Sequence, residues 1–512
     1  MDNSFKIYIK PELFDHLIYP INVKLDDEKI ISLFRKLHIM SEIDFKIPMK
    51  EWLKNASEIG LTKTEATVLF QTFKIYEGDL PESSSSTKNR YESTTNNKNS
   101  VDVRYFGLFF ALQSFSQRTK ISLIVDKTEK NPSYFTSPLS SPRGKSSNNY
   151  RLASQGLEYQ FILNYIKSNL KLFLRIVASD IHNTETTICA NEFNTLKFLF
   201  TIEDNKHNSI HDKNKKGVSL SNYLHCFDNL PPVTKINMNI INEFLLSTLS
   251  NSAPELSNYC TIKGLSKCVT IKTGNEYQNK NLLISNCDDT YIYINTNVSN
   301  CKISLCTNCT IVIAVASKII TLDKCEKCNI CIISNFTRIS NMIDSNVYLF
   351  SVNEPILYGD NRGLRLGPHN VTYNELYIHV KESRLTISQN SYKNFSLPIY
   401  LNNNNNNKEH INIIKPEEFT TIVVPFEAND PFNYILTPKP YLEVIQKRYN
   451  NYANIQKMIK EAGFQESQEK AFHIALQGFF REWLVTSGNF KPMNDLVKMI
   501  DEPYGIGPLN SK

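Results

Sequence analysis

The sequence lacks a long apolar run. Its most apolar segment, residues 105–112, falls far short of the roughly 18 apolar residues that a membrane-spanning helix needs. Residues 1–17 hold no unbroken apolar stretch of the kind found in signal peptides. There is no glycine after Met1 for myristoylation and no C-terminal cysteine for prenylation. We therefore expect a soluble protein of the cytoplasm, with its eleven cysteines in the reduced state.

A strong excess of one charge is also missing. The chain has 57 Lys and Arg against 51 Asp and Glu, a net charge of +6, and its longest basic block is only residues 213–216. Nucleic-acid binding needs a clustered basic patch. This composition predicts no nucleic-acid partner.

The common catalytic motifs are absent. We find no Gly-x-Ser-x-Gly, no His-Glu-x-x-His and no Gly-x4-Gly-Lys-Ser/Thr. Five histidines that could serve in catalysis stand singly, at positions where ordinary surface or core roles suffice: His38, His182, His225, His369 and His379. The sequence predicts no cofactor and no complete catalytic set.

The 512 residues are enough for two to four domains. Ser-, Asn- and Pro-rich stretches at 82–100 and 131–150 predict disordered inserts, and the Asn run at 402–407 predicts a linker. Apolar residues at helical spacing predict helices over 25–39, 65–76, 156–177, 240–249, 441–462 and 469–485. We expect an α-helical N-terminal region over 1–250, a central domain over 251–385, and an Asn-rich linker with a helical C-terminal region over 386–512.

The central region carries a repeat of 19 residues, marked by Cys268, Cys287, Cys306 and Cys325. Short apolar runs separated by polar corners favour strands over helices. A period near 20 predicts a solenoid, because each coil buries its apolar face only against its neighbours. The fold class we predict is a right-handed parallel β-helix of five or six coils with helical flanks.

Two interior columns and one outward strip follow from this period. The first column is predicted as Thr273, Ile292, Ile311, Ile330 and Leu349, with Ile294, Ile313 and Ile332 alongside. The second is predicted as Leu282, Cys301, Ile320 and Ile339. Tyr293, Val312, Cys331 and Phe350 should point outward as an apolar strip, which either the flanking helices or a partner protein would cover. We take Tyr293, Val312 and Phe350 as a candidate binding surface.

Two pairs of cysteines have the spacing of a zinc ribbon, Cys306-x2-Cys309 and Cys325-x2-Cys328. The same register continues to Cys268 and Cys287, and apolar strands rather than tight turns follow the pairs. We therefore favour a structural ladder of small buried thiols and expect no metal.

Arg338 lies beside a coil corner, one residue before the predicted interior Ile339. A rigid solenoid would give its guanidinium a fixed platform from which to reach a partner's phosphates. The alternative is an ordinary solvated surface arginine.

Residues 306–373 resemble the C-CAP/cofactor C-like domain of the tubulin-binding cofactor C family. The matching pieces are CTNCTIVIAVASKIITLDKCEKCNICIIS, FTRIS and VYLFSVNEPILYGDNRGLRLGPHNVTYNEL. The resemblance covers a short part of the chain. Together with the helical flanks, it is most similar to a branch of the family linked to centrosome or spindle-pole organisation.

The resemblance implies a GTPase-activating role for catalytic members, which insert an arginine finger into tubulin or an Arf-like GTPase. Arg338 falls on the finger position. Phe336 stands where the family has Gln, Ser340 where it has His, and His369 where it has a closing Tyr. We therefore expect a non-enzymatic organiser of centrosome, spindle pole, organelle position and cell shape, with GTPase activation through Arg338 as the alternative.

Overall fold

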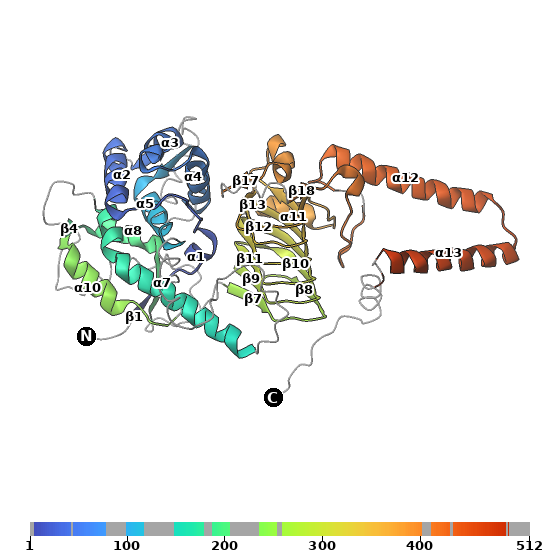
Figure 1. Ribbon diagram of the computed structural model, residues 1–512, viewed down its shortest axis with the longest axis horizontal. Helices are drawn as coiled ribbons and strands as arrows, with labels where there is room; N and C mark the ends of the chain where they lie inside the picture. The colour runs from blue at the N-terminus through green and yellow to red at the C-terminus, as the bar shows by residue number, and fades with distance from the viewer. Residues whose placement is uncertain are drawn as a thin grey trace.

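The computed structural model describes residues 5–41, 45–77, 99–116, 148–178, 187–204, 235–252, 259–401, 411–430, 434–487 and 490. Figure 1 shows a helical N-terminal region beside a stack of parallel strands, with two long helices extending from the far side of the stack. Most of the predicted inserts, and the Asn run, lie outside the described residues. Ser100 and residues 148–150, at the ends of the predicted inserts, begin a strand and a helix instead.

The N-terminal region is a helical core with short strand pairs at its edges. Its helices are α1 (Glu12–His16), α2 (Asp27–Met40), α3 (Met49–Ala56), α4 (Lys63–Glu77), α5 (Val103–Leu112), α7 (Asn148–Val177), α8 (Ala190–Thr195) and α10 (Met238–Thr248). Its strands are β1 (Phe5–Ile9), β2 (Lys46–Pro48), β3 (Ser100–Asp102), β4 (Thr187–Ile188), β5 (Phe200–Asp204) and β6 (Ile236–Asn237). The predicted helices over 25–39, 65–76, 156–177 and 240–249 are confirmed as α2, α4, α7 and α10.

Helix α5 forms the centre of this region because it is apolar on every side and nearly all its residues are buried. Phe106 packs edge-on against Trp52, with ring centroids 4.7 Å apart. Gly107 lets α7 approach closely, since a Cβ there would lie 2.5 Å from Cγ2 of Ile176. The Asp102 side chain caps the first turn by accepting from the Arg104 amide at 3.0 Å.

The central region is a parallel β-solenoid, as predicted. Its strands are β7 (Tyr259–Lys263), β8 (Val269–Thr273), β9 (Asn281–Ser285), β10 (Tyr291–Val298), β11 (Cys301–Ser304), β12 (Thr310–Asp323), β13 (Asn329–Ser340), β14 (Asn346–Ser351), β15 (Ile356–Tyr358), β16 (Leu364–Pro368), β17 (Ile399–Tyr400) and β18 (Ile411–Ile413). One corner of each coil forms a ladder of bridges through Ser266, Asp288, Thr307, Glu326, Ile343 and Arg362. Those positions mark six coils, most of them 19 residues apart.

The predicted columns are correct in the middle of the solenoid. They are wrong at three terminal positions, Thr273, Leu349 and Ile339. Ile292, Ile311 and Ile330 do align, but their neighbours in the stack are Thr270 and Val347 rather than Thr273 and Leu349. In the second column Ile320 pairs with Thr337, and Ile339 pairs with Leu322. At Leu349 and Ile339 the physical reason is that the coil between Glu326 and Ile343 has two residues fewer, lost at the bend within β13. At Thr273 the reason is that the coil between Ser266 and Asp288 has three residues more.

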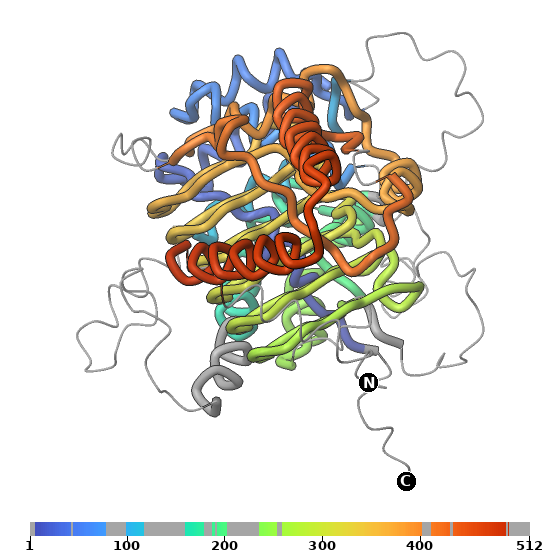
Figure 2. The backbone as a smooth tube through the Cα atoms, turned by 90° about the vertical axis from the view of Figure 1, so that its right-hand side faces the viewer, coloured from blue at the N-terminus to red at the C-terminus, as the bar shows by residue number. Residues whose placement is uncertain are grey.

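The C-terminal region first wraps the solenoid and then leaves it. Its elements are α11 (Leu376–Glu382), η7 (Gln389–Ser396), η9 (Pro416–Glu418), α12 (Lys439–Glu461) and α13 (Glu466–Thr486). Helices α12 and α13 confirm the two predicted last helices, and Figure 2 shows them in front of the solenoid. No helix in the described part of the chain is both long and apolar enough to span a bilayer.

Candidate functional site around Arg338

Strand β13 carries Arg338 on the face of the solenoid that meets the N-terminal region. Arg338 pairs in register with Thr321 on one side and Ile356 on the other. Only 3% of its surface is exposed. Arg338 is therefore not the solvated surface arginine of the alternative interpretation.

The guanidinium of Arg338 is enclosed by the segment that follows α1. Its Nη2 donates to the backbone oxygen of Ile18 at 2.5 Å and to the hydroxyl of Tyr358 at 3.0 Å. Cζ of Arg338 lies over the ring of Tyr19, 4.3 Å from its centroid, and 5.3 Å from the centroid of the Tyr358 ring. A neutral carbonyl and two aromatic rings thus take the place of a carboxylate partner.

The electrostatics of this pocket keep the arginine charged. Burial opposes its charge, but Tyr358 and Tyr19 outweigh that effect and raise the pKa of Arg338. Burial likewise raises the pKa of Tyr19 to about 12, so its ring stays neutral beside the cation. Nε and Nη1 of Arg338 are buried without a hydrogen-bond partner within the described residues. Two of the three guanidinium nitrogens are therefore unused as donors, and Arg338 is held by the two hydrogen bonds of Nη2, by packing and by cation–π contact.

Further polar contacts tie the same two parts of the chain together. Nζ of Lys302 lies 2.5 Å from a carboxylate oxygen of Asp15, and Nδ1 of His16 lies 3.1 Å from Oγ1 of Thr321. The Tyr76 hydroxyl donates to Oδ1 of Asn300 at 2.8 Å. Burial lowers the pKa of His16 to about 3, so this histidine is neutral at physiological pH.

Apolar side chains of the solenoid complete the junction. Ile319, Phe336, Ile356 and Leu401 belong to the hydrophobic core of the N-terminal region rather than to the core inside the solenoid. The junction is therefore a continuous packed core, and Arg338 lies within it.

The family positions beside Arg338 have structural partners of their own. Phe336 is fully buried in the junction. Ser340 donates to Oδ1 of Asp323 at 2.7 Å. His369, at the closing position, is buried, which lowers its pKa to about 3, and its backbone oxygen accepts from Thr437 at 2.7 Å. None of the three approaches the guanidinium through a contact that the structure records among the described residues.

The predicted outward strip lies beneath the chain's own C-terminal wrap. Tyr293, Val312 and Phe350 are each 2% exposed. Tyr293 packs edge-on against Phe426, with ring centroids 6.1 Å apart, and Phe350 packs against Tyr392 at 5.5 Å. Because of the shortened coil, the residue in register with Cys331 is Tyr348 rather than Phe350.

The cysteine ladder runs along one interior corner. Cys287, Cys306 and Cys325 are buried, whereas Cys268 at the open end is half-buried. The thiol of Cys306 donates to the backbone oxygen of Ser304 at 3.4 Å, and those of Cys287 and Cys325 make the same contact two residues back. Cys309 and Cys328 repeat this contact at 3.2 and 3.3 Å. In the described residues no group of three or more His, Cys, Asp or Glu side chains is placed to hold a metal.

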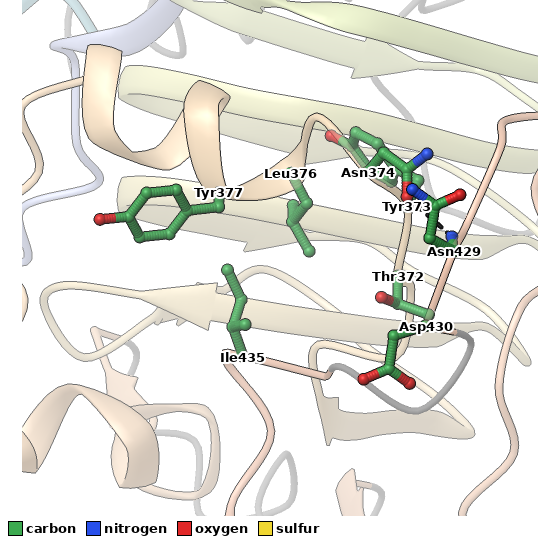
Figure 3. Close-up of a pocket in the computed structure, with 8 residues that line it drawn as sticks. All are labelled: Thr372, Tyr373, Asn374, Leu376, Tyr377, Asn429, Asp430 and Ile435. Atoms are coloured by element: carbon green, nitrogen blue, oxygen red, sulfur yellow. Dashed lines mark hydrogen bonds between the residues drawn. The ribbon is translucent and has the colours of Figure 1, made fainter.

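A shallow pocket of about 150 Å³ lies beside α11. Figure 3 shows Tyr377 and Leu376 facing Ile435 across it, with Thr372, Asn429 and Asp430 toward its other end. A space of this size holds a few water molecules and is far below the roughly 300–1,000 Å³ of a typical ligand site. The pocket therefore offers no site for a nucleotide.

Comparison with known proteins agrees with this architecture. Residues 279–396 match the family model "Tubulin binding cofactor C", and these residues include β9 to η7 and Arg338. The chain thus carries a domain of the tubulin-binding cofactor C family, which confirms the predicted family.

The similar proteins extend beyond that domain. The chain is 26% identical over 248 residues to TBCC domain-containing protein 1 of Xenopus tropicalis, which covers 48% of this chain and 44% of that protein. It is 25% identical over 451 residues to the Xenopus laevis protein of the same name, covering 78% and 79% of the two chains. It is 22% identical over 492 residues to the Rattus norvegicus protein, covering 86% and 85%. The similarity therefore includes the N-terminal region as well as the solenoid.

Sequence reasoning singled out Arg338 but missed the residues that enclose it. Ile18 contributes only its backbone oxygen, and Tyr19 lies in a segment with no helical or strand period.

Proposed function

We propose that this protein is a non-enzymatic, cytoskeleton-associated organiser that uses its solenoid as a rigid scaffold. Its similarity to the tubulin-binding cofactor C family supports tubulin-related protein partners. The finer role that we propose is organisation of the centrosome or spindle pole, of organelle position and of cell shape, from the cytoplasm and cytoskeleton. The partners would be centrosomal or spindle-pole components and tubulin.

One observation carries the non-enzymatic part of this proposal: Arg338 is enclosed by Ile18, Tyr19 and Tyr358. An arginine finger must extend into the nucleotide site of another protein, where it neutralises charge on the transferring phosphoryl group. To extend, Arg338 would have to leave its partners and expose part of a continuous core. Each large apolar side chain exposed in this way costs about 1.5–3 kcal/mol.

The second candidate is a GTPase activator for tubulin or an Arf-like GTPase. The observation that favours it is that Nε and Nη1 of Arg338 have no hydrogen-bond partner among the described residues. These buried donors are available to a phosphate, but both planar forks of a guanidinium include Nη2, so bidentate binding also requires Nη2 to leave Ile18 and Tyr358. In this alternative the N-terminal segment must move aside before Arg338 can act.

The test is single-turnover GTP hydrolysis by tubulin, with the other tubulin cofactors added, and by an Arf-like GTPase. The organiser hypothesis expects no stimulation by the wild-type protein or by Arg338→Ala. Stimulation that disappears in Arg338→Ala and in Arg338→Lys would overturn it, because lysine keeps the charge but loses the planar fork.

Two further variants distinguish two explanations for a lack of stimulation. Either the junction covers an active Arg338, or Arg338 is inactive even when it is uncovered. Tyr19→Ala removes the aromatic cover and leaves Arg338 in place, whereas Lys302→Ala weakens the same junction away from the guanidinium. Stimulation by Tyr19→Ala alone would support a GTPase activator held closed. For the organiser role, we expect Arg338→Lys to localise in cells as the wild type does, and loss of localisation in that variant would contradict it.

A further inference from the structure

The two C-terminal helices, which we call the C-terminal arm (α12 and α13), carry an unusual exposed apolar surface. The large apolar side chains of α13 that are at least 44% exposed are Ile474, Leu476, Phe479, Phe480, Trp483 and Val485. Single exposed apolar residues are common, but a contiguous group this large on a soluble protein marks an interaction site.

On α13 these side chains form a stripe. Leu476, Phe479, Phe480 and Trp483 follow the i, i+3, i+4, i+7 spacing that places residues on one face of a helix. Their exposed fractions are 52%, 72%, 44% and 52%. Ile474 lies off this face although it is 70% exposed.

Helix α12 carries a second stripe that begins on the solenoid and continues past it. Near its start, the hydroxyl of Tyr441 donates to the backbone oxygen of Ile414 at 2.7 Å, and Arg448 donates to that of Phe419 at 2.5 Å. Tyr452 and Ile455 lie on the same face, about one and two turns beyond Arg448. They are 59% and 55% exposed. The covered half of the stripe thus runs directly into an uncovered half.

The two helices do not cover one another. Gly463, with φ of +58°, closes α12, and α13 starts at Glu466 after a short link. Figures 1 and 2 show the pair extending from the solenoid and joined at the far end. Helices joined by so short a link usually bury their apolar faces together. Here both stripes stay uncovered, so each needs a partner from outside the arm.

We propose that the C-terminal arm is a dimerisation element, in which α12 of one copy packs against α13 of a second copy and the reverse. The charges of the two helices favour this pairing. Helix α12 has five Lys or Arg against two Glu, a net charge of +3, whereas α13 has two against three, a net charge of −1. Pairing α12 with α12 would bring like charges together, whereas α12 with α13 is complementary. A two-fold arrangement satisfies both stripes of both copies at once.

The available area fits a stable dimer. The six exposed side chains of the two stripes, Tyr452, Ile455, Leu476, Phe479, Phe480 and Trp483, would each bury about 100 Å². With their polar flanks they approach the roughly 800 Å² per partner of a standard protein interface. The arm therefore forms a four-helix bundle in the dimer, at the end of the molecule remote from Arg338.

The test is the mass of the full-length protein in solution, measured by sedimentation equilibrium and by light scattering after gel filtration. We expect the wild type to be a dimer, and Phe479→Glu with Trp483→Glu to weaken association at least about 100-fold, because each charge enters the interface twice. The matched control is Ile474→Glu, on the same helix and equally exposed but off the stripe, which should leave association unchanged. All these positions are exposed, so the melting curve of the solenoid should be the same in each variant.

A mixing experiment tests the proposed pairing itself. Tyr452→Glu with Ile455→Glu disrupts α12, and Phe479→Glu with Trp483→Glu disrupts α13. Each variant alone should be monomeric, but an equimolar mixture should form a heterodimer, because α12 of one and α13 of the other are both intact. A mixture that stays monomeric would reject the α12 to α13 pairing.

Two results with the wild type would overturn the proposal. One is a monomer at about 100 μM, a concentration at which even a weak dimer of this area should form. The other is a monomer whose stripe residues are protected from hydrogen exchange, which would mean that the arm closes on itself or is covered by residues 491–512. Binding of such a monomer to lipid vesicles or to another protein would likewise reject self-association.

Discussion

Replacing Tyr19 by alanine tests whether the junction around Arg338 is a stabilising core. Tyr19 is 1% exposed, its ring covers the guanidinium at 4.3 Å, and its hydroxyl lies 3.0 Å from Oγ1 of Thr72. Removing a fully buried aromatic ring costs about 3–5 kcal/mol, from lost transfer energy and from the cavity that remains. We expect Tyr19→Ala to lower the free energy of unfolding of the N-terminal region by that amount.

The matched variant is Tyr19→Phe, which loses only the hydroxyl contact with Thr72. A single buried hydrogen bond contributes about 0.5–1.5 kcal/mol, so this variant should be several times less costly. The contact with the cation is measured by a double-mutant cycle of Tyr19→Ala with Arg338→Met. A desolvated cation–π pair predicts a coupling of about 2 kcal/mol.

The chain offers a suitable fluorescence assay because it has only two tryptophans. Trp52 is fully buried in the N-terminal core, where its indole N–H donates to the backbone oxygen of Ala66 at 2.8 Å. Trp483, which is 52% exposed within one copy, lies in the proposed dimer interface, so the titration is carried out in a Trp483→Phe background. The emission of Trp52 in a urea titration therefore reports the N-terminal region. A loss below about 1 kcal/mol in Tyr19→Ala, or no coupling to Arg338, would refute the reasoning.

Three further predictions concern the core, the pH response and the cysteines. Gly107→Ala should cost about 1–3 kcal/mol by overpacking against Ile176, measured by the same urea titration, and an unchanged midpoint would contradict the close approach. The pKa of His16 is about 3 in the folded state, below its unfolded value near 6.5. Between these values the unfolded state binds one more proton, so the free energy of unfolding should fall as pH falls from about 7 toward 3. His16→Asn should flatten this dependence when Trp52 emission is followed; an equally steep fall would reject the assignment. Cys306→Ala should lower the melting temperature of the solenoid, with a cost of about 1 kcal/mol, and Cys268→Ala should lower it far less. A chelator should leave the β-rich circular dichroism unchanged, and loss of that signal would indicate a metal.

The sequence predicted those parts of the fold that depend on local periodicity. Helices such as α2, α7 and α12 follow from apolar residues at helical spacing, and the solenoid follows from the cysteines 19 residues apart. The columns failed at Thr337 and Val347 because one coil is two residues shorter, and a constant period cannot detect a deletion at a bend.

The surroundings of Arg338 could not be predicted in this way. Two of its three partners are residues 18 and 19, and one of these contacts it only through a backbone oxygen. A backbone atom leaves no trace in residue type. The position of Arg338 in the sequence therefore identified a candidate residue, while its enclosure depends on tertiary contacts between distant segments.

The long-range contacts of Arg338 have a consequence during protein synthesis. The oxygen of Ile18 and the guanidinium that donates to it are separated by 320 residues. At about 5–20 residues per second, a ribosome needs about 15–60 seconds to make the chain between them. For that interval Ile18 and Tyr19 have emerged but their partner strand does not yet exist. Until β13 has been synthesised, this edge of the nascent N-terminal region must be kept from binding other chains. A chaperone would therefore bind this edge during that interval.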